Sequence, residues 1–130
     1  MSAHDINASL VDLAELKVSA TTTGEEAMAA IRQLATFNQC MVGVVRFTGL
    51  TPWERHPDDE LLYVVEGAVE VTILDRQGAA AVSTVRAGSI CVVPAGCWHR
   101  QNPKPSVALL FLTSQQGNDA SWDEMPDVAA

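Results

Sequence analysis

Positive charge and cysteine are both scarce in this sequence. Lys and Arg together number 8 against 16 Asp and Glu, which gives a net charge of −8 at pH 7 with histidine neutral. Because a chain this acidic repels phosphate groups and has no basic cluster, we expect no nucleic-acid partner. The three cysteines, Cys40, Cys91 and Cys97, form no Cys-x-x-Cys pair. This argues against a disulfide framework and favours a reducing, cytoplasmic location.

Long apolar runs and several common catalytic motifs are also missing. No run approaches the roughly 18–20 apolar residues that span a bilayer, so we expect no membrane partner. The N-terminal segment shows no basic region followed by an apolar stretch, so we expect no secretory signal. The sequence holds no Gly-x-Ser-x-Gly, P-loop, Gly-x-Gly-x-x-Gly or His-Glu-x-x-His motif. Function must therefore be sought in other residue patterns.

The composition is that of a globular chain of one domain. Hydrophobic residues make up 48% of the 130 residues and charged residues 18%, which suffices for a buried core. We divide the chain into an N-terminal extension of residues 1–39, a barrel of residues 40–113 and an acidic tail of residues 114–130. The tail loses hydrophobic periodicity, so we expect it to be docked or frayed. Trp122 in the tail either covers the mouth of the barrel or packs elsewhere.

One helix is predicted, over about residues 24–37 of the N-terminal extension. Thr23 can cap its first turn, and Glu26 stands three residues later, as a capping box requires. Met28 and Ile31 then begin a series of apolar residues at helical spacing.

After Cys40, short β-rich runs alternate with Gly, Pro and Asp. Seven short strands spaced about 8–12 residues apart are typical of an all-β sandwich or barrel. We expect these strands at residues 41–47, 61–66, 68–74, 80–86, 90–93, 98–101 and 107–112.

Histidine and carboxylate side chains stand at the edges of these predicted strands. Glu54 and His56 are two residues apart, so on a strand they face the same side, and Glu60 follows across a Pro-Asp-Asp turn. His99 follows a Pro-x-Gly turn at the start of another predicted strand. Imidazoles and carboxylates are donors that divalent metals use in proteins. The pattern therefore predicts a metal site inside the barrel.

At these positions the sequence resembles the cupin superfamily. Gly49, His56, Glu60 and Gly67 match residues of the first cupin motif, including the six residues between Glu60 and Gly67. The family's first metal-binding histidine falls on Glu54 here.

The second cupin motif, Gly-x5-Pro-x-Gly-x2-His-x3-Asn, is matched by Gly88, Pro94, Gly96 and His99, while Asn102 comes one residue early. The resemblance covers about residues 40–112. It implies a small single-domain cupin, which is an RmlC-like antiparallel jelly-roll barrel, or double-stranded β-helix. It also implies a homodimer, which would protect exposed sheet edges.

The resemblance implies His56, Glu60 and His99 as metal ligands. Two histidines and one carboxylate form the type of set that binds non-haem iron with open positions. The implied cofactor is a divalent Fe, Mn, Zn or Ni ion. Glu54 is then a fourth ligand, a catalytic general base toward a bound substrate, or a solvated carboxylate near Arg55.

Strand parity predicts which side chains line the pocket. Leu62 shares the parity of Glu60, whereas Cys97 and Gln101 share that of His99, so we expect all three to face the barrel interior. Gln101 is a candidate to hold a substrate oxygen. The thiol of Cys97 is expected to be buried and inert.

Two functions follow from these residues, because a fold does not determine its chemistry. The first is a metal-dependent enzyme acting on a small organic molecule, with a dioxygenase-like reaction as the first expectation and an isomerase or lyase reaction as alternatives. The second is a non-catalytic module that binds a small ligand and lacks metal. The expected partners are a small-molecule ligand and a second copy of the chain.

Overall fold

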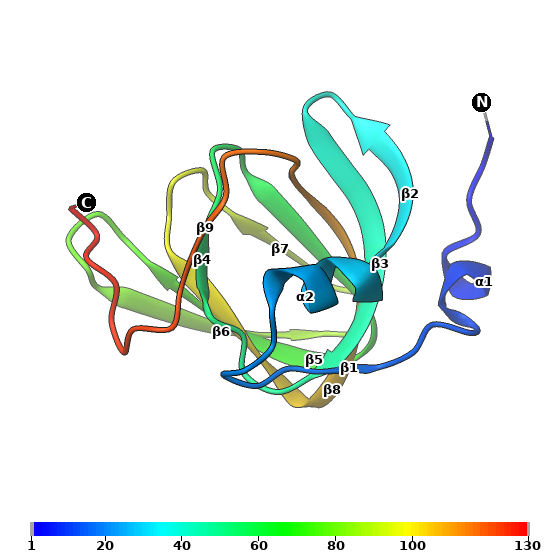
Figure 1. The fold of residues 1–130 in the computed structure, drawn as a ribbon, viewed down its shortest axis with the longest axis horizontal. Helices are drawn as coiled ribbons and strands as arrows, with labels where there is room; N and C mark the ends of the chain where they lie inside the picture. The colour runs from blue at the N-terminus through cyan, green and yellow to red at the C-terminus, as the bar shows by residue number, and fades with distance from the viewer. Residues whose placement is uncertain (1, 130) are drawn as a thin grey trace.

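A curled sheet wound into an open barrel forms the body of the molecule (Figure 1). The computed structural model describes residues 2–129. The predicted all-β jelly-roll fold is confirmed. In chain order the elements are α1 (Ile6–Leu10), β1 (Leu16–Lys17), α2 (Gly24–Ala30), β2 (Arg32–Phe37), β3 (Cys40–Thr48), β4 (Trp53–Arg55), β5 (Glu60–Leu74), β6 (Ala80–Arg86), β7 (Ile90–Val93), β8 (His99–Ser114) and β9 (Asp119–Ser121).

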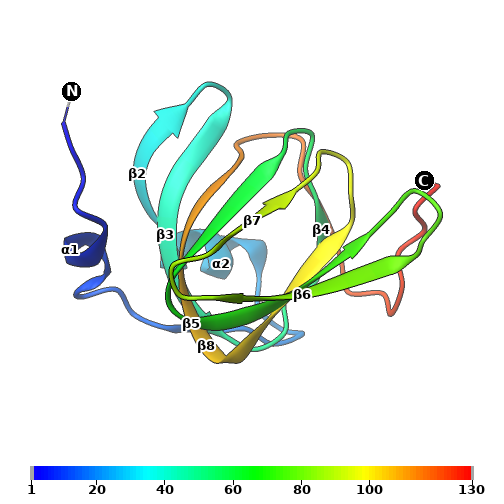
Figure 2. The same cartoon turned by 180° about the vertical axis from the view of Figure 1, so that it is seen from behind.

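Strands β5 and β8 are the longest and pair with each other along most of their length. β3 continues the sheet on the far side of β8, while β6 and β7 pair with β5 (Figure 2). The sequence predicts two strands, at residues 61–66 and 68–74, in place of β5, because glycine between two β-rich runs favours a turn. Gly67 instead has a positive φ of 78° and lies at irregularities in the register, so the strand continues through it. β8 likewise runs without interruption through the gap between the predicted strands at residues 98–101 and 107–112.

The predicted N-terminal helix is too long. The capping box is present, with Thr23 and Glu26 bonded to each other's backbone N–H groups, but α2 ends at Ala30. Residues 32–37 form β2 instead, because their backbone pairs with β3, and this tertiary pairing overrides the local helical pattern. The short helix α1 was also not predicted. Within residues 2–129 no helix is long and apolar enough to span a membrane.

The main core lies inside the curled sheet and is built from the inward-facing residues of β3, β5 and β8. At the start of β5, buried and partly exposed residues alternate, as a strand with one covered face requires. In β3, Val44 on the opposite face is also buried, because it packs against Leu10 of α1. The largest buried cluster contains Met41, Val45, Phe47, Leu62, Val64, Val69, Val71, Val85, Val93, Val107, Leu109 and Phe111.

The C-terminal tail is docked along the barrel edge. β9 pairs with β4, and β4 pairs with β8 at Glu54 opposite His99. Two further contacts fasten the tail: Nε1 of Trp53 donates to the carbonyl oxygen of Glu124 at 3.2 Å, and Arg55 forms an ion pair with Asp119 at 2.8 Å. The tail therefore covers the edge of β4 next to the predicted metal residues.

Candidate metal centre

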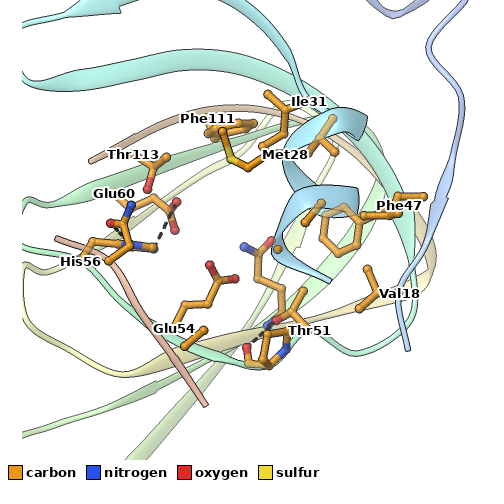
Figure 3. A pocket seen from close by; sticks show the side chains of 18 of the residues that line it. Val18, Met28, Ile31, Phe47, Thr51, Glu54, His56, Glu60, Phe111 and Thr113 are labelled. Carbon is orange, nitrogen blue, oxygen red and sulfur yellow. Dashed lines mark hydrogen bonds and ion pairs between the residues drawn. The ribbon is translucent and has the colours of Figure 1, made fainter. Parts of the chain in front are cut away.

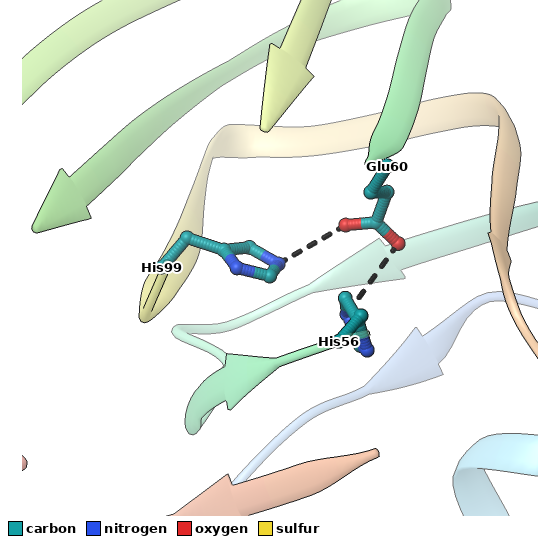
Figure 4. Close-up of side chains that lie close together, drawn as sticks. All are labelled: His56, Glu60 and His99. Carbon is teal, nitrogen blue, oxygen red and sulfur yellow. Dashed lines mark hydrogen bonds and ion pairs between the residues drawn. The ribbon is translucent and has the colours of Figure 1, made fainter. Parts of the chain in front are cut away.

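Three of the predicted ligands lie together in the barrel (Figure 4). His56 directly follows β4, Glu60 begins β5 and His99 begins β8. One ligand atom from each residue can be chosen so that all lie within 4.8 Å of one another. All three side chains are buried, with His99 only 1% exposed. Two segments that are distant in sequence, residues 56–60 and the start of β8, thus bring two imidazoles and one carboxylate to one point.

Glu60 lies between the two imidazole rings. Its Oε1 is 3.0 Å from Nε2 of His99 and its Oε2 is 3.7 Å from Nε2 of His56, while the ring centroids are 5.1 Å apart. Burial alone would raise the pKa of Glu60, but the hydrogen bond and charge of His99, with the charge of His56, bring that pKa below its ordinary value. Burial opposes protonation of His99, yet the hydrogen bond and charge of Glu60 raise the pKa of His99.

Nδ1 of each imidazole ring lies within hydrogen-bond distance of an acceptor. Nδ1 of His99 lies 3.1 Å from the carbonyl oxygen of Cys97, and Nδ1 of His56 lies 2.7 Å from Oδ1 of Asn118. Asn118 is oriented in turn because its Nδ2 donates to the carbonyl oxygen of Ser114. These acceptors place the hydrogen on Nδ1 of both rings. Nε2 of each ring is therefore directed at the shared point, as in histidines that bind metal.

The donor set fits a divalent cation. Imidazole Nε2 atoms and a carboxylate suit Zn, Fe, Mn or Ni, and the Nδ1 contacts fix the rings in the orientation that metal binding needs. Asn118 was missed by the sequence reasoning. It lies beyond the second motif in the tail, and its position depends on the pairing of β9 with β4, for which the sequence holds no local signal.

Glu54 is near this set but not part of it. Its side chain points into the adjoining cavity and makes no hydrogen bond with the other side chains drawn in Figure 3. Burial raises the pKa of Glu54, and the negative charge of Glu60 raises it further, against the opposing effect of the two histidines. Of the four predicted ligands, the structure gathers three and leaves Glu54 facing the cavity.

The cavity beside the metal residues has a volume of about 390 Å³. Strands β3, β5 and β8 form one wall, and α2 and the tail form another. Figure 3 shows Met28 and Ile31 of the α2 region across the cavity from Glu54. The apolar side chains that line it are Leu16, Val18, Ala27, Met28, Ile31, Met41, Val45, Phe47, Leu62, Leu109, Phe111, Ala120 and Trp122, with Pro52 at the edge.

Of the three pocket residues predicted from strand parity, two line the cavity and one does not. Leu62 and Gln101 line the cavity, and Trp122 of the tail also lines it. Cys97 is not among the described residues that line this cavity, because β8 begins only at His99 and strand parity does not apply to the preceding residues. Cys97 is half-buried. Its contribution comes from its backbone carbonyl, which holds His99.

Comparison with known families agrees with this geometry. The model of the cupin domain matches residues 45–113, a range that contains His56, Glu60 and His99. The chain belongs to the cupin family. The resemblance recognised in its two motifs is thereby confirmed.

Similar proteins span a range of functions. An uncharacterized protein, YdbB of Bacillus subtilis, is 28% identical over 94 residues, which cover 72% of this chain and 80% of YdbB. A cupin-2 domain containing protein of Shewanella frigidimarina superposes with a TM-score of 0.56 at 22% identity, over 73% of this chain and 95% of that one. Oxalate oxidase in complex with glycolate gives a TM-score of 0.55 at 28% identity, over 64% of this chain. This chain spans only 46% of the oxidase.

Proposed function

We propose that this chain is a metal-dependent enzyme that acts on a small organic molecule. The observation that carries the proposal is the buried set His56, Glu60 and His99 beside an apolar cavity of about 390 Å³. Apolar clefts of this size with a few converging polar groups are typical small-molecule sites. The cupin family model, which covers all three residues, supports the same conclusion.

In this proposal His56 and His99 bind a divalent Fe, Mn, Zn or Ni ion through Nε2, and Glu60 binds it through its carboxylate. Such an ion would supply Lewis acidity, or electron transfer if it is redox-active, at its open positions. Asn118 and the Cys97 carbonyl hold the two rings in place. The apolar wall and α2 would flank the bound molecule.

Glu54 is the residue to which we assign proton transfer. Its carboxylate points into the cavity beside the metal residues, where a bound molecule would lie (Figure 3). At its carboxylate oxygens it would accept a proton from that molecule or return one. A proton-transfer role is consistent with the position of Glu54 outside the set of His56, Glu60 and His99.

A dioxygenase-like reaction is our first choice of chemistry. Two histidines and one carboxylate with open positions are the arrangement that non-haem iron oxygenases use. The likeness to oxalate oxidase supports oxidative chemistry on a small molecule. Isomerase and lyase reactions would use the same donors together with proton transfer at Glu54.

One observation favours a second function, that of a ligand-binding module without metal. Nε2 of His99 and Oε1 of Glu60 are 3.0 Å apart, so this pair can satisfy itself by a hydrogen bond with no cation. The two functions predict different metal contents.

The test is the metal content of the purified chain by inductively coupled plasma mass spectrometry. The enzyme proposal predicts one equivalent of a transition metal, lost in His56→Ala and His99→Ala. The exposed His4 provides the matched control, because His4→Ala removes an imidazole outside the site and should retain the metal. A metal-free chain whose melting temperature is unaffected by chelator or added metal contradicts the proposal and favours the binding module.

A further inference from the structure

Acidic side chains predominate among the ionisable residues that the structure describes in the lining of the cavity. Among the described residues that line it, the ionisable ones are Glu54, His56 and Glu60, and none is Lys or Arg. An anionic group at the end of the cavity away from the metal residues would have no Lys or Arg side chain among the described lining residues to offset its charge. Because charges are costly to desolvate in apolar surroundings, the lining disfavours a ligand with negative charge away from the metal residues.

Apolar side chains make up most of the wall away from the metal residues, together with a few threonines. Val18, Met28 and Phe47 lie along this wall in Figure 3, on the far side of the cavity from His56 and Glu60. Two methionines among the lining residues add flexible, polarisable surface that adapts to an apolar ligand. The larger part of a well-matched ligand is therefore apolar.

Two polar side chains in this lining, Gln101 and Thr113, have a buried hydrogen-bonding atom without a partner among the described residues, and Thr113 lies next to Glu60 in Figure 3. Gln101 is 8% exposed, and its Oε1 is buried without a hydrogen-bond partner. An unpartnered amide oxygen in a buried position costs free energy, and a ligand that pairs with it recovers that cost.

Two hydrogen bonds hold the backbone of Gln101 in place, so its side chain projects from a fixed position. Its N–H donates to Oγ1 of Thr51 at 2.9 Å, and the N–H of Thr51 donates to the carbonyl oxygen of Gln101 at 3.0 Å. The carboxamide itself turns about a broad terminal torsion, so it can offer either its oxygen or its NH₂ group. A hydroxyl group, which both donates and accepts, matches either orientation.

We propose that this cavity takes an uncharged, largely apolar molecule with a hydroxyl group that hydrogen bonds to the carboxamide of Gln101. The inference rests on the proposed function, because it assigns the substrate class of the same site. It also separates this chain from enzymes of small dicarboxylic acids, which carry charge at both ends. Gln101 selects the hydroxyl, and the apolar wall selects the rest of the molecule.

The test uses three probes of nearly the same shape: p-cresol, p-xylene and p-toluate. Their binding to the purified full chain is measured by isothermal titration calorimetry at neutral pH, where p-cresol is uncharged and p-toluate is an anion. The proposal predicts that p-cresol binds at least about tenfold more tightly than either of the others, since a site built for a hydroxyl discriminates against analogues that lack it.

Gln101→Leu is the diagnostic variant, because it removes the carboxamide and keeps a side chain of comparable volume. The proposal predicts that it abolishes the preference for p-cresol over p-xylene and leaves p-xylene binding unchanged. Gln101→Met repeats the test with an unbranched side chain in case the leucine does not pack. Gln77→Leu, at an exposed turn, is the matched control and should bind like the parent chain.

Three results would overturn this inference: tighter binding of p-toluate than of p-cresol, an undiminished p-cresol preference in folded Gln101→Leu, or no binding of any probe at millimolar concentration. Metal content is measured on the same samples. Loss of metal from His99→Ala together with any of these results overturns the substrate class and leaves the metal proposal standing. Hydroxyl selectivity in a chain that contains no metal would support the substrate class and overturn the metal proposal.

Discussion

Oδ1 of Asn118 accepts a hydrogen bond from Nδ1 of His56 at 2.7 Å, across 62 residues of sequence. The bond sets the direction of the imidazole ring, because with Nδ1 engaged only Nε2 can face Glu60. The amide of Asn118 is itself anchored to the carbonyl oxygen of Ser114 at the end of β8. A residue of the C-terminal tail thus positions a candidate metal ligand.

Asn118→Ala should weaken metal binding while the fold is retained. Groups that orient metal-binding histidines commonly contribute about 10–100-fold in affinity, and we expect a loss in this range. Competition with a chromophoric chelator measures the affinity. Asn7→Ala, in the exposed part of α1, is the matched control. An unchanged affinity in folded Asn118→Ala would mean that the hydrogen bond does not position His56.

Glu54 and Glu60 are two acidic side chains at one site to which the account gives different roles. Glu60→Gln should lose the metal, because Glu60 lies between the two Nε2 atoms. Glu54→Gln should retain it, because Glu54 is outside the set of residues whose ligand atoms converge. Metal analysis of the two variants side by side gives the answer. Loss of metal from Glu54→Gln would make Glu54 a fourth ligand instead of a proton-transfer residue.

Gly67 and Gly88 give a matched pair for testing why the cupin motifs contain glycine. Both have positive φ, at 78° and 87°. A Cβ on Gly67 would lie 2.2 Å from the carbonyl oxygen of Ser106, whereas a Cβ on Gly88 would meet nothing within 4 Å.

Gly88→Ala should therefore cost only the strain of a left-handed backbone, about 1–2 kcal/mol. Gly67→Ala should lower the free energy of unfolding by more, because β5 and β8 must separate to admit the methyl group. Urea denaturation of both variants measures the difference. Equal losses of unfolding free energy in the two variants would show that the left-handed backbone conformation alone explains the glycine at position 67.

The capping box of α2 predicts a local effect on the cavity wall. Thr23→Ala removes the hydrogen bond that the N–H of Glu26 donates to Oγ1 of Thr23, which should destabilise the helix by about 1 kcal/mol. Because α2 contributes no fully buried residue, we expect faster amide hydrogen exchange in residues 24–30 with little change in global stability. Thr84→Ala, on the exposed β6, is the control. Unchanged exchange in α2 would contradict this role of the cap.

The sequence predicted the parts of the site that local spacing determines. His56, Glu60 and His99 stand beside strand edges marked by Pro and Gly, so their positions in the fold follow from the motifs that carry them. Gln101 lines the cavity because it is two residues beyond His99 on β8, where alternation holds. The alternation of side chains does not extend to Cys97, because this residue lies before β8 begins.

Features that depend on pairing between distant segments were not predicted. Residues 32–37 have the spacing of a helix, yet the partner strand β3 makes them extended. The contact of Asn118 with His56 depends on β9 docking against β4, which no local motif reports. The division at residues 39 and 113, the homodimer and the cytoplasmic location stay predictions.

Anomalous X-ray scattering from crystals of the purified chain, recorded at the absorption edges of iron, manganese, nickel and zinc, tests the metal assignment most directly. The account predicts one strong peak at about 2.0–2.2 Å from Nε2 of His56, Nε2 of His99 and an oxygen of Glu60. The edge at which this peak appears would identify the ion. Crystals of chain grown with these metals present that show no peak there, and His99 still hydrogen bonded to Glu60, would contradict the account.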